Sequence, residues 1–219
     1  MTRLRRDVHR LIGRLCFGAA ALLAATAGMA WAEQPGPHYA QPMPHTVSHA
    51  GALLVARPEM SDPRFARAVI FLVRHNADGA MGLVVNKPVE HRPVAQVLKD
   101  FGIDGVAAKG DIDVHYGGPV QLELAFVLHT PDYRGPDTVI VNDNFAMTAD
   151  PQILRDIAAG KGPKKSILAR GYAGWGPGQL EGELALRAWE VVPADPELVF
   201  GGHPEDLWER AIKRRGVDL

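Results

Sequence analysis

Two unbroken apolar runs separated by a short polar turn constrain the fold of this chain more than any other feature. Ala68–Val73 and Ala80–Val85 are uncharged and rich in branched aliphatic residues, which is typical of buried strands. The segment between them contains His75–Gly79, HNADG, whose Asn, Asp and Gly favour a tight turn. The pattern therefore predicts a β-hairpin with both strands in the interior.

Further apolar segments of strand length follow along the chain, and four helices alternate irregularly with them. Each predicted helix has a proline in its first turn: Pro93, Pro151 after the N-cap residue Asp150, Pro177 and Pro204. Strand pairs with few interspersed helices favour an α+β fold over a regular βαβ sheet. The additional predicted strands are Leu53–Ala56, Val114–Tyr116, Leu124–Leu128, Thr138–Val141, Ser166–Gly171 and Ala188–Val192.

The glycine-rich stretch Gly171–Glu183, GYAGWGPGQLEGE, invites comparison with a dinucleotide-binding loop. That motif needs a strand, then G-x-G-x-x-G, then a helix, with an acid about 20 residues further on. Here the third glycine comes one position early, and Pro177 removes a backbone donor that a pyrophosphate needs. Glu181 and Glu183 add negative charge near the helix start. We interpret the stretch as a structural corner from strand to helix and expect no cofactor.

The first 32 residues have the pattern of a secretory signal. Five arginines precede an uncharged apolar segment that ends in Ala30-Trp31-Ala32, the small-x-small pattern cut by signal peptidase. Residues 33–49 hold four prolines and three histidines without apolar periodicity and are predicted to be a linker before a domain at 50–219. We expect a periplasmic or secreted protein. A retained membrane anchor and a cytoplasmic protein that starts at Met43 are the alternatives.

Charge and cysteine content exclude several classes of function. Removal of the first 32 residues takes away five Arg and one Asp, which leaves 19 basic and 24 acidic residues and a formal charge of −5. Proteins that bind nucleic acids usually present a basic face, so we expect no nucleic acid partner. The chain's one cysteine, Cys16, precedes the domain, so a metal site there would need His and carboxylate ligands. No such spacing occurs, and no metal is expected.

The stretch GYAGWGPGQLEGEL resembles the signature segment of the YqgE/AlgH family of bacterial proteins. The resemblance implies one α+β domain with a mixed, mostly antiparallel bifurcated sheet that folds toward a pseudo-barrel, with about four peripheral helices. It implies no activity and supplies no catalytic residues. Family members usually begin near Gly51, so the N-terminal extension departs from the pattern. Other matching motifs are Ala56–Phe65, the hairpin around His75–Leu83, Asn86–Pro88, Tyr116–Val120, Phe126–His129 and Trp208.

Candidates for catalysis are few. The domain has no Gly-x-Ser-x-Gly, and after Ser48 its serines are only Ser61 and Ser166. His129 ends an apolar strand and is the best single candidate for an acid or base, although an isolated histidine is more often structural. Asp62-Pro63 and Asn86-Lys87-Pro88 have the composition of turns, in which side chains close local backbone bonds.

Two hypotheses follow for the function. The first is a non-catalytic binding or regulatory domain, without direct DNA binding, for an unknown protein or small-molecule partner. The second is a hydrolase or metal-dependent enzyme that uses a His/Asp pair, with His129 and either Asp62 or another acid as its members. A membrane contact is expected only through an uncleaved N-terminal segment. The candidate binding-loop residues are Arg57, Asp62, Asn86, Gly117, Gly118, His129, Tyr172 and Trp175.

Overall fold

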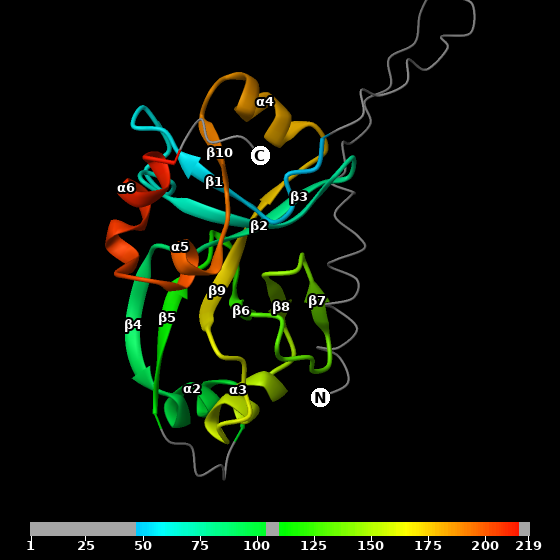
Figure 1. Ribbon diagram of the computed structural model, residues 1–219, viewed down its shortest axis with the longest axis vertical. Coiled ribbons are helices and arrows are strands. Elements are labelled where there is room, and N and C mark those ends of the chain that lie inside the picture. Colours follow the sequence, from blue (N-terminus) through cyan, green and yellow to red (C-terminus); the bar gives the residue numbers. More distant parts are fainter. Residues whose placement is uncertain (1–46, 104–109, 215–219) are drawn as a thin grey trace, which may run out of the picture.

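A computed structural model describes residues 47–103 and 110–214 (Figure 1). The predicted signal segment, almost all of the predicted linker and Met43 lie outside these described residues. The strands are β1 (Ala52–Ala56), β2 (Val69–Asn76), β3 (Gly79–Val84), β4 (Pro88–Pro93), β5 (Asp111–Tyr116), β6 (Val120–His129), β7 (Thr138–Ile140), β8 (Ala146–Thr148), β9 (Ser166–Trp175) and β10 (Trp189–Pro193). The helices are α2 (Val94–Asp100), α3 (Gln152–Ala158), α4 (Gln179–Ala185), α5 (Pro196–Phe200), the 3-10 turn η1 (Pro204–Asp206) and α6 (Leu207–Ile212).

The predicted hairpin is confirmed as β2 and β3, which pair antiparallel from Ile70 with Val84 to Asn76 with Gly79. The Asn76 side chain accepts a hydrogen bond from the Asp78 backbone N–H in the turn, at 2.9 Å. Strand β1 pairs with β2 on one side and with β10 on the other. All the other predicted strand segments are also found, and the α+β class is confirmed.

Strand β9 joins two halves of one bifurcated sheet. Its first half lies between β6 and β5, and its second half pairs with β3. The order β10-β1-β2-β3-β9-β6-β8-β7 forms the main path, while β5 and β4 branch off at β9. Among the described strands, β5 and β9 form the only parallel pair. Figure 1 shows β9 running from the lower half, beside β5 and β6, to the upper half, beside β3, so that the sheet curls into a half-barrel.

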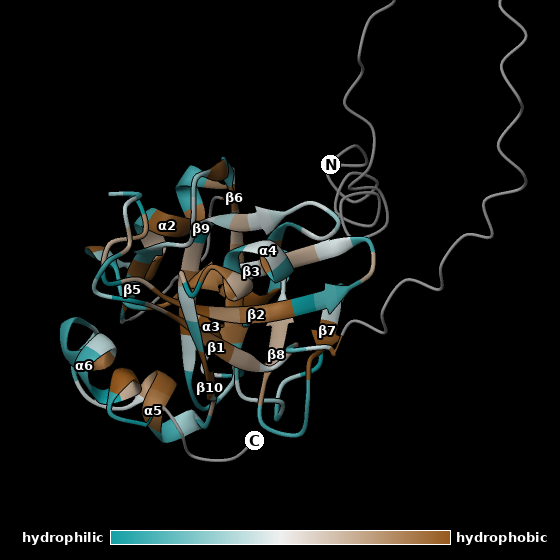
Figure 2. Cartoon of the chain, turned by 90° about the horizontal axis from the view of Figure 1, so that it is seen from above, coloured by the Kyte–Doolittle hydropathy of each residue, from teal (hydrophilic) through white to brown (hydrophobic). Residues whose placement is uncertain are grey.

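Both faces of the upper half are covered, which explains its unbroken apolar runs. Leu53 and Val55 of β1 pack in a cluster with α5 and α6, and the alternate residues Leu54 and Ala56 pack in a second cluster beneath α4. A third cluster places α2 and α3 against β5, β6 and β9 in the lower half. Figure 2 shows the hydrophobic colour concentrated on β1, β2 and the inner strands. Each fully buried aliphatic side chain contributes about 1.5–3 kcal/mol to this core.

The described residues contain five α-helices around the sheet, where four were predicted. The missed helix is α5, and Asp195 directly precedes it as the N-cap residue. The Asp195 carboxylate accepts a 2.8 Å hydrogen bond from the Leu198 N–H. Asp195 is thus a helix cap, although it occupies the position of the acid in a dinucleotide motif. None of the helices within the described residues is long and apolar enough to cross a bilayer.

The prediction of a corner across Gly171–Glu183 is wrong for its first five residues, because β9 continues to Trp175. The turn is confined to Gly176–Gly178, and α4 begins at Gln179 rather than at Pro177. Leu180 and Leu184 belong to this helix, whereas Ala188 lies beyond its end. The cross-strand bonds to β3 and β6 hold the glycine-rich segment extended.

Candidate functional site

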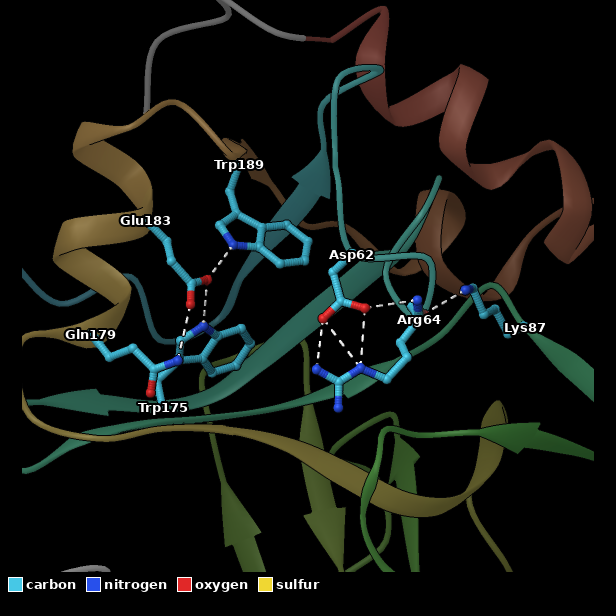
Figure 3. A network of polar contacts seen from close by, with 7 residues as sticks. All are labelled: Asp62, Arg64, Lys87, Trp175, Gln179, Glu183 and Trp189. Carbon is cyan, nitrogen blue, oxygen red and sulfur yellow. Dashed lines mark hydrogen bonds and ion pairs between the residues drawn. The ribbon is translucent and has the colours of Figure 1, made fainter.

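A cavity of about 420 Å³ is lined by residues of three motifs that are distant in the sequence. These motifs are Ala56–Phe65, Tyr116–Val120 and the glycine-rich stretch Gly171–Glu183. The loop after β1 lies on one side of it, and the end of β9 with α4 lies on another. Its lining residues are Met60, Ser61, Asp62, Arg64, Phe65, Pro119, Val120, Gly174, Trp175, Gln179, Glu183, Ala188 and Trp189. Figure 3 shows the polar network that borders this cavity.

The Glu183 carboxylate organises the indole side of the cavity (Figure 3). Its Oε2 atom accepts hydrogen bonds from the Trp175 Nε1–H at 2.9 Å and the Trp189 Nε1–H at 2.8 Å. The two rings meet edge to face with centroids 6.2 Å apart. Both tryptophans are only 4% exposed. Because one charged oxygen holds two buried indole donors, Glu183 acts as a positioning group rather than as a free acid.

The start of α4 places Glu183 over the indoles. Gly178, with φ of +72°, precedes the helix in the left-handed conformation. The Gln179 amide donates to the other Glu183 oxygen at 3.0 Å, and its carbonyl accepts from the Gly176 N–H at 3.1 Å. Gln179 and Glu183 are one helical turn apart and so face the same side. The turn and the helix therefore fix the carboxylate together.

Asp62 and Arg64 form the polar side of the cavity (Figure 3). The Arg64 guanidinium donates to both Asp62 oxygens, with Nη2 to Oδ2 at 2.7 Å and Nε to Oδ1 at 3.0 Å. These side-chain bonds, with a backbone bond from Arg64, lower the pKa of Asp62. Lys87 Nζ donates to the Arg64 carbonyl at 2.8 Å, and burial lowers the pKa of Lys87. The predicted turn at Asp62-Pro63 is confirmed, since Asp62 Oδ1 accepts from the Arg64 N–H at 2.9 Å.

Arg57 is half-buried beside this site, and it does not line the cavity. Its Nη1 donates to Glu190 Oε1 of β10 at 2.9 Å. Its guanidinium also lies 3.5 Å from the Glu59 carboxylate. Arg57 therefore links the loop after β1 to β10 through Glu190, while its contact with Glu59 lies within the loop.

Gly117, Gly118 and Tyr172 are packing residues in this structure. A Cβ atom on Gly117 would overlap the backbone of Gly171, and one on Gly118 would overlap the Tyr172 backbone. Gly118 also has φ of +147°, a conformation that favours glycine. The Tyr172 ring is 2% exposed and packs edge to face with Phe126 at 6.0 Å. These residues let the segment before β6 approach β9 closely.

Asn86 is buried and bridges two segments of backbone. Its Oδ1 accepts from the Val69 N–H at 2.8 Å, and its Nδ2 donates to the Arg67 carbonyl at 2.8 Å. The expectation that this side chain closes a local turn is wrong, because its partners lie 17 and 19 residues away. Asn86 instead holds the chain where it enters β2.

His129 is fully buried, and both of its ring nitrogens are hydrogen-bonded. Nδ1 lies 2.8 Å from the Thr130 carbonyl, which accepts only, so Nδ1 carries the proton. Nε2 then accepts from the Thr148 hydroxyl at 2.8 Å. Burial lowers the pKa of His129, which favours the neutral ring. Asp62 bonds Arg64, so the structure does not pair His129 with it.

Two described histidines meet carboxylates, the exposed His91 with Asp113 and the buried His75 with Glu181. The His75 Nε2 lies 3.1 Å from Glu181 Oε1 of α4, and its Nδ1 accepts the His49 backbone N–H at 3.1 Å. With both nitrogens engaged and the ring 4% exposed, His75 fastens α4 to the end of β2. Within residues 47–103 and 110–214, no group of three or more His, Cys, Asp or Glu is placed to hold a metal ion.

Of the eight candidates named from the sequence, Asp62 and Trp175 line the cavity. Sequence reasoning missed Gln179, Glu183 and Trp189, which complete it. The spacing of Gln179 and Glu183 on a helix directly after Trp175 contains a signal, because i and i+4 side chains share one face. Trp189 lies in a separate strand, and only the fold brings it to the cavity.

Comparisons with known proteins agree with this architecture. The model of the AlgH-like family matches residues 53–219. A UPF0301 protein of Jannaschia sp. (strain CCS1) is 48% identical over 170 residues, covering 77% of this chain and 88% of that protein. A UPF0301 protein of Rhodospirillum rubrum is 46% identical over 168 residues, covering 77% of this chain and 88% of that one.

A solved structure gives the same result at the level of the fold. The solution structure of the AlgH protein from Pseudomonas aeruginosa superposes with a TM-score of 0.68 at 40% sequence identity. The match covers 85% of this chain and 94% of the AlgH chain. The resemblance noted from the sequence motifs is thereby confirmed. The chain belongs to the AlgH-like family.

Proposed function

We propose that this protein is a non-catalytic binding or regulatory domain, without direct DNA binding, and that the cavity beside Trp175 and Trp189 is its ligand site. The single observation that carries the proposal is the convergence of three separate motifs on one cavity of about 420 Å³. Binding sites are typically concave, with apolar walls and a few fixed polar groups. Met60 and Phe65 supply apolar surface, while Asp62, Arg64 and Gln179 supply the polar groups.

The state of the carboxylates supports binding rather than catalysis. A general acid or base needs a proton-accepting atom free to reach the substrate and a pKa suited to the task. Glu183 Oε2 already accepts from two indoles, and Asp62 accepts from Arg64. The pKa of Asp62 is lowered, which makes it a weaker base. The enzyme hypothesis with His129 and Asp62 gains no support, because their hydrogen bonds join them to other residues.

The expected ligand is a small molecule, or a side chain of a partner protein, that combines an apolar body with a hydrogen-bonding group. The apolar part would contact Phe65 and the indole edges, and the polar part would reach the Asp62–Arg64 pair. Arg64 has an exposed side chain and can rotate to meet a carboxylate or carbonyl of the ligand.

The test is a screen of small polar-apolar compounds by the NMR signals of the indole N–H groups in the full-length chain. Ligands of the cavity should shift the Trp175 and Trp189 signals together. Ser61→Tyr places a bulky ring at an exposed position of the cavity wall and should abolish these shifts. Ala66→Tyr is the matched control, at an exposed position of the same loop outside the cavity.

Two results contradict the proposal. One is that every ligand found binds the Ser61→Tyr and Ala66→Tyr variants equally well, which places binding elsewhere. The other is chemical turnover of a bound compound that disappears in the Ser61→Tyr variant, which favours the enzyme hypothesis.

A further inference from the structure

A second cavity, of about 390 Å³, lies beside α5 and α6. It is bounded by β5, by the segment before β9 and by the glycines after α5. Figure 1 shows α5 and α6 close to one end of β5. None of its lining residues belongs to the cavity beside Trp175. The inference below is therefore independent of the proposed function.

Positive charge dominates this second cavity. Lys164, Lys165 and Arg210 line it, and Asp113 is the one acidic residue among the described lining residues. The Asp113 carboxylate lies 2.7 Å from His91 Nδ1, so it already has a partner. The Lys165 ammonium is 3.7 Å from Glu197, an exposed ion pair that contributes little to stability. The cavity thus has cationic groups available for an anion.

Two buried nitrogen atoms in the wall have no hydrogen-bond partner among the described residues. One is Nδ1 of His115, a residue that is only 2% exposed, and the other is Nε of Arg210. A buried polar atom left unpaired costs about 1–3 kcal/mol. Both residues line the cavity, but neither atom is exposed to it, so a ligand contacts these atoms only if the two side chains turn toward it. The attraction for an anion therefore comes from the three cations that line the cavity.

Local backbone geometry keeps space for the arginine. Gly202 has φ of +73°, and a Cβ atom there would lie 3.3 Å from the Arg210 guanidinium carbon. Glycine at this position therefore lets the guanidinium lie against the loop after α5. Burial lowers the pKa of His115, opposed by the nearby charge of Asp113, a backbone hydrogen bond to Val85 and the charge of Glu205. An oxyanion would add a further contribution that raises this pKa.

We propose that this second cavity binds a phosphate monoester of a small organic molecule, with Arg210 and the two lysines around the phosphoryl oxygens and His115 in the wall beside them. Arginine and lysine together match the charge of a phosphate dianion. The cavity volume of about 390 Å³ favours an ester over the free phosphate ion. A water molecule occupies about 30 Å³, and a bare phosphate ion, which is only a few times larger, would leave most of the cavity empty.

The experiment titrates the full-length chain with glycerol 3-phosphate and, separately, with inorganic phosphate, and follows the ring Cε1–H signal of His115 by NMR. We expect a saturable shift with both, because both carry the phosphoryl group. Tighter binding of the ester identifies an organic phosphate as the ligand. Equal binding identifies the oxyanion alone as the recognised group, which keeps the anion site and overturns the ester.

A charge-matched pair of variants tests the assignment of residues. Lys164→Gln with Lys165→Gln removes two exposed cations from the wall and should weaken phosphate binding about tenfold or more. Lys161→Gln with Lys213→Gln changes the net charge equally at exposed positions outside the cavity and should change affinity less than about twofold. Absence of a saturable His115 shift, or an equal loss in both double variants, overturns the proposal.

Discussion

At the residue scale, Trp175 shows how one side chain serves both the core and the cavity. Its ring is 4% exposed and packs on Trp189, while its N–H reaches Glu183 at 2.9 Å. We predict that Trp175→Ala lowers the free energy of unfolding by about 3–5 kcal/mol, because it leaves a large void. Trp175→Phe keeps most of the volume and removes only the hydrogen bond, so its loss should be smaller. Denaturant unfolding measures both, and equal stability of Trp175→Ala and wild type would show that the ring is not a packing residue.

His129 supports a prediction about pH. Burial lowers its pKa in the folded state, so as the pH falls below about 6.5 the unfolded chain takes up this proton first. Stability contributed by neutral His129 is therefore present above about pH 6.5 and is lost as the pH falls through the folded pKa. We expect His129→Gln to reduce the loss of stability between pH 7.5 and 5.

The control for this effect is His91→Gln. His91 is exposed, and its hydrogen bond to Asp113 raises its pKa, so its linkage has the opposite sign. Removal of His91 should not reduce the acid loss of stability. Urea unfolding at the two pH values measures both variants. An unchanged pH dependence in His129→Gln would contradict the neutral, buried state inferred for this ring.

At the scale of elements, the glycines around α4 have opposite roles. Gly182 lies inside the helix, is exposed and has open space at its Cβ position, whereas Gly178 precedes the helix with φ of +72°. Gly182→Ala should stabilise the protein by about 0.5–1 kcal/mol, because alanine has the better helix propensity. Gly178→Ala should destabilise it, because alanine is strained at positive φ. Thermal unfolding of the two variants checks this, and shifts of the same sign would contradict the argument.

The elements also show where sequence patterns stop being informative. Buried segments such as β1, β2 and β3 are apolar on both faces, so composition alone predicts them. Strand β4, PVEHRP, is almost wholly exposed and bounded by prolines, and it is a strand only because β5 pairs with it. The segment GYAGW is a second example. Its glycines suggest a turn, but it is a strand because β3 and β6 pair with it. In the cavity, Trp175 and Asp62 were predicted as binding candidates, and the spacing of Gln179 and Glu183 contained a signal that was missed, while Trp189 depends on tertiary contacts that no local pattern encodes.

At the scale of the whole molecule, the distribution of charge bears on nucleic acid binding. The chain has 24 basic and 25 acidic residues, and many of its arginines are paired with carboxylates. Examples are Arg57 with Glu190, Arg92 with Asp100 and Arg214 with Asp195. The second cavity gathers only three basic residues, Lys164, Lys165 and Arg210. Duplex DNA is bound through a row of phosphate contacts, which needs an extended basic surface.

We therefore predict that duplex DNA is not bound with sub-micromolar affinity at physiological salt. A gel-shift titration with a random 30-base-pair duplex tests this directly, with the Lys164→Gln, Lys165→Gln double variant beside the wild type. A weak complex through the second cavity should be displaced by glycerol 3-phosphate and should disappear in the double variant, because both act on the same few cations. A tight complex that survives both treatments would contradict the prediction, since it would require an extended basic surface outside the second cavity.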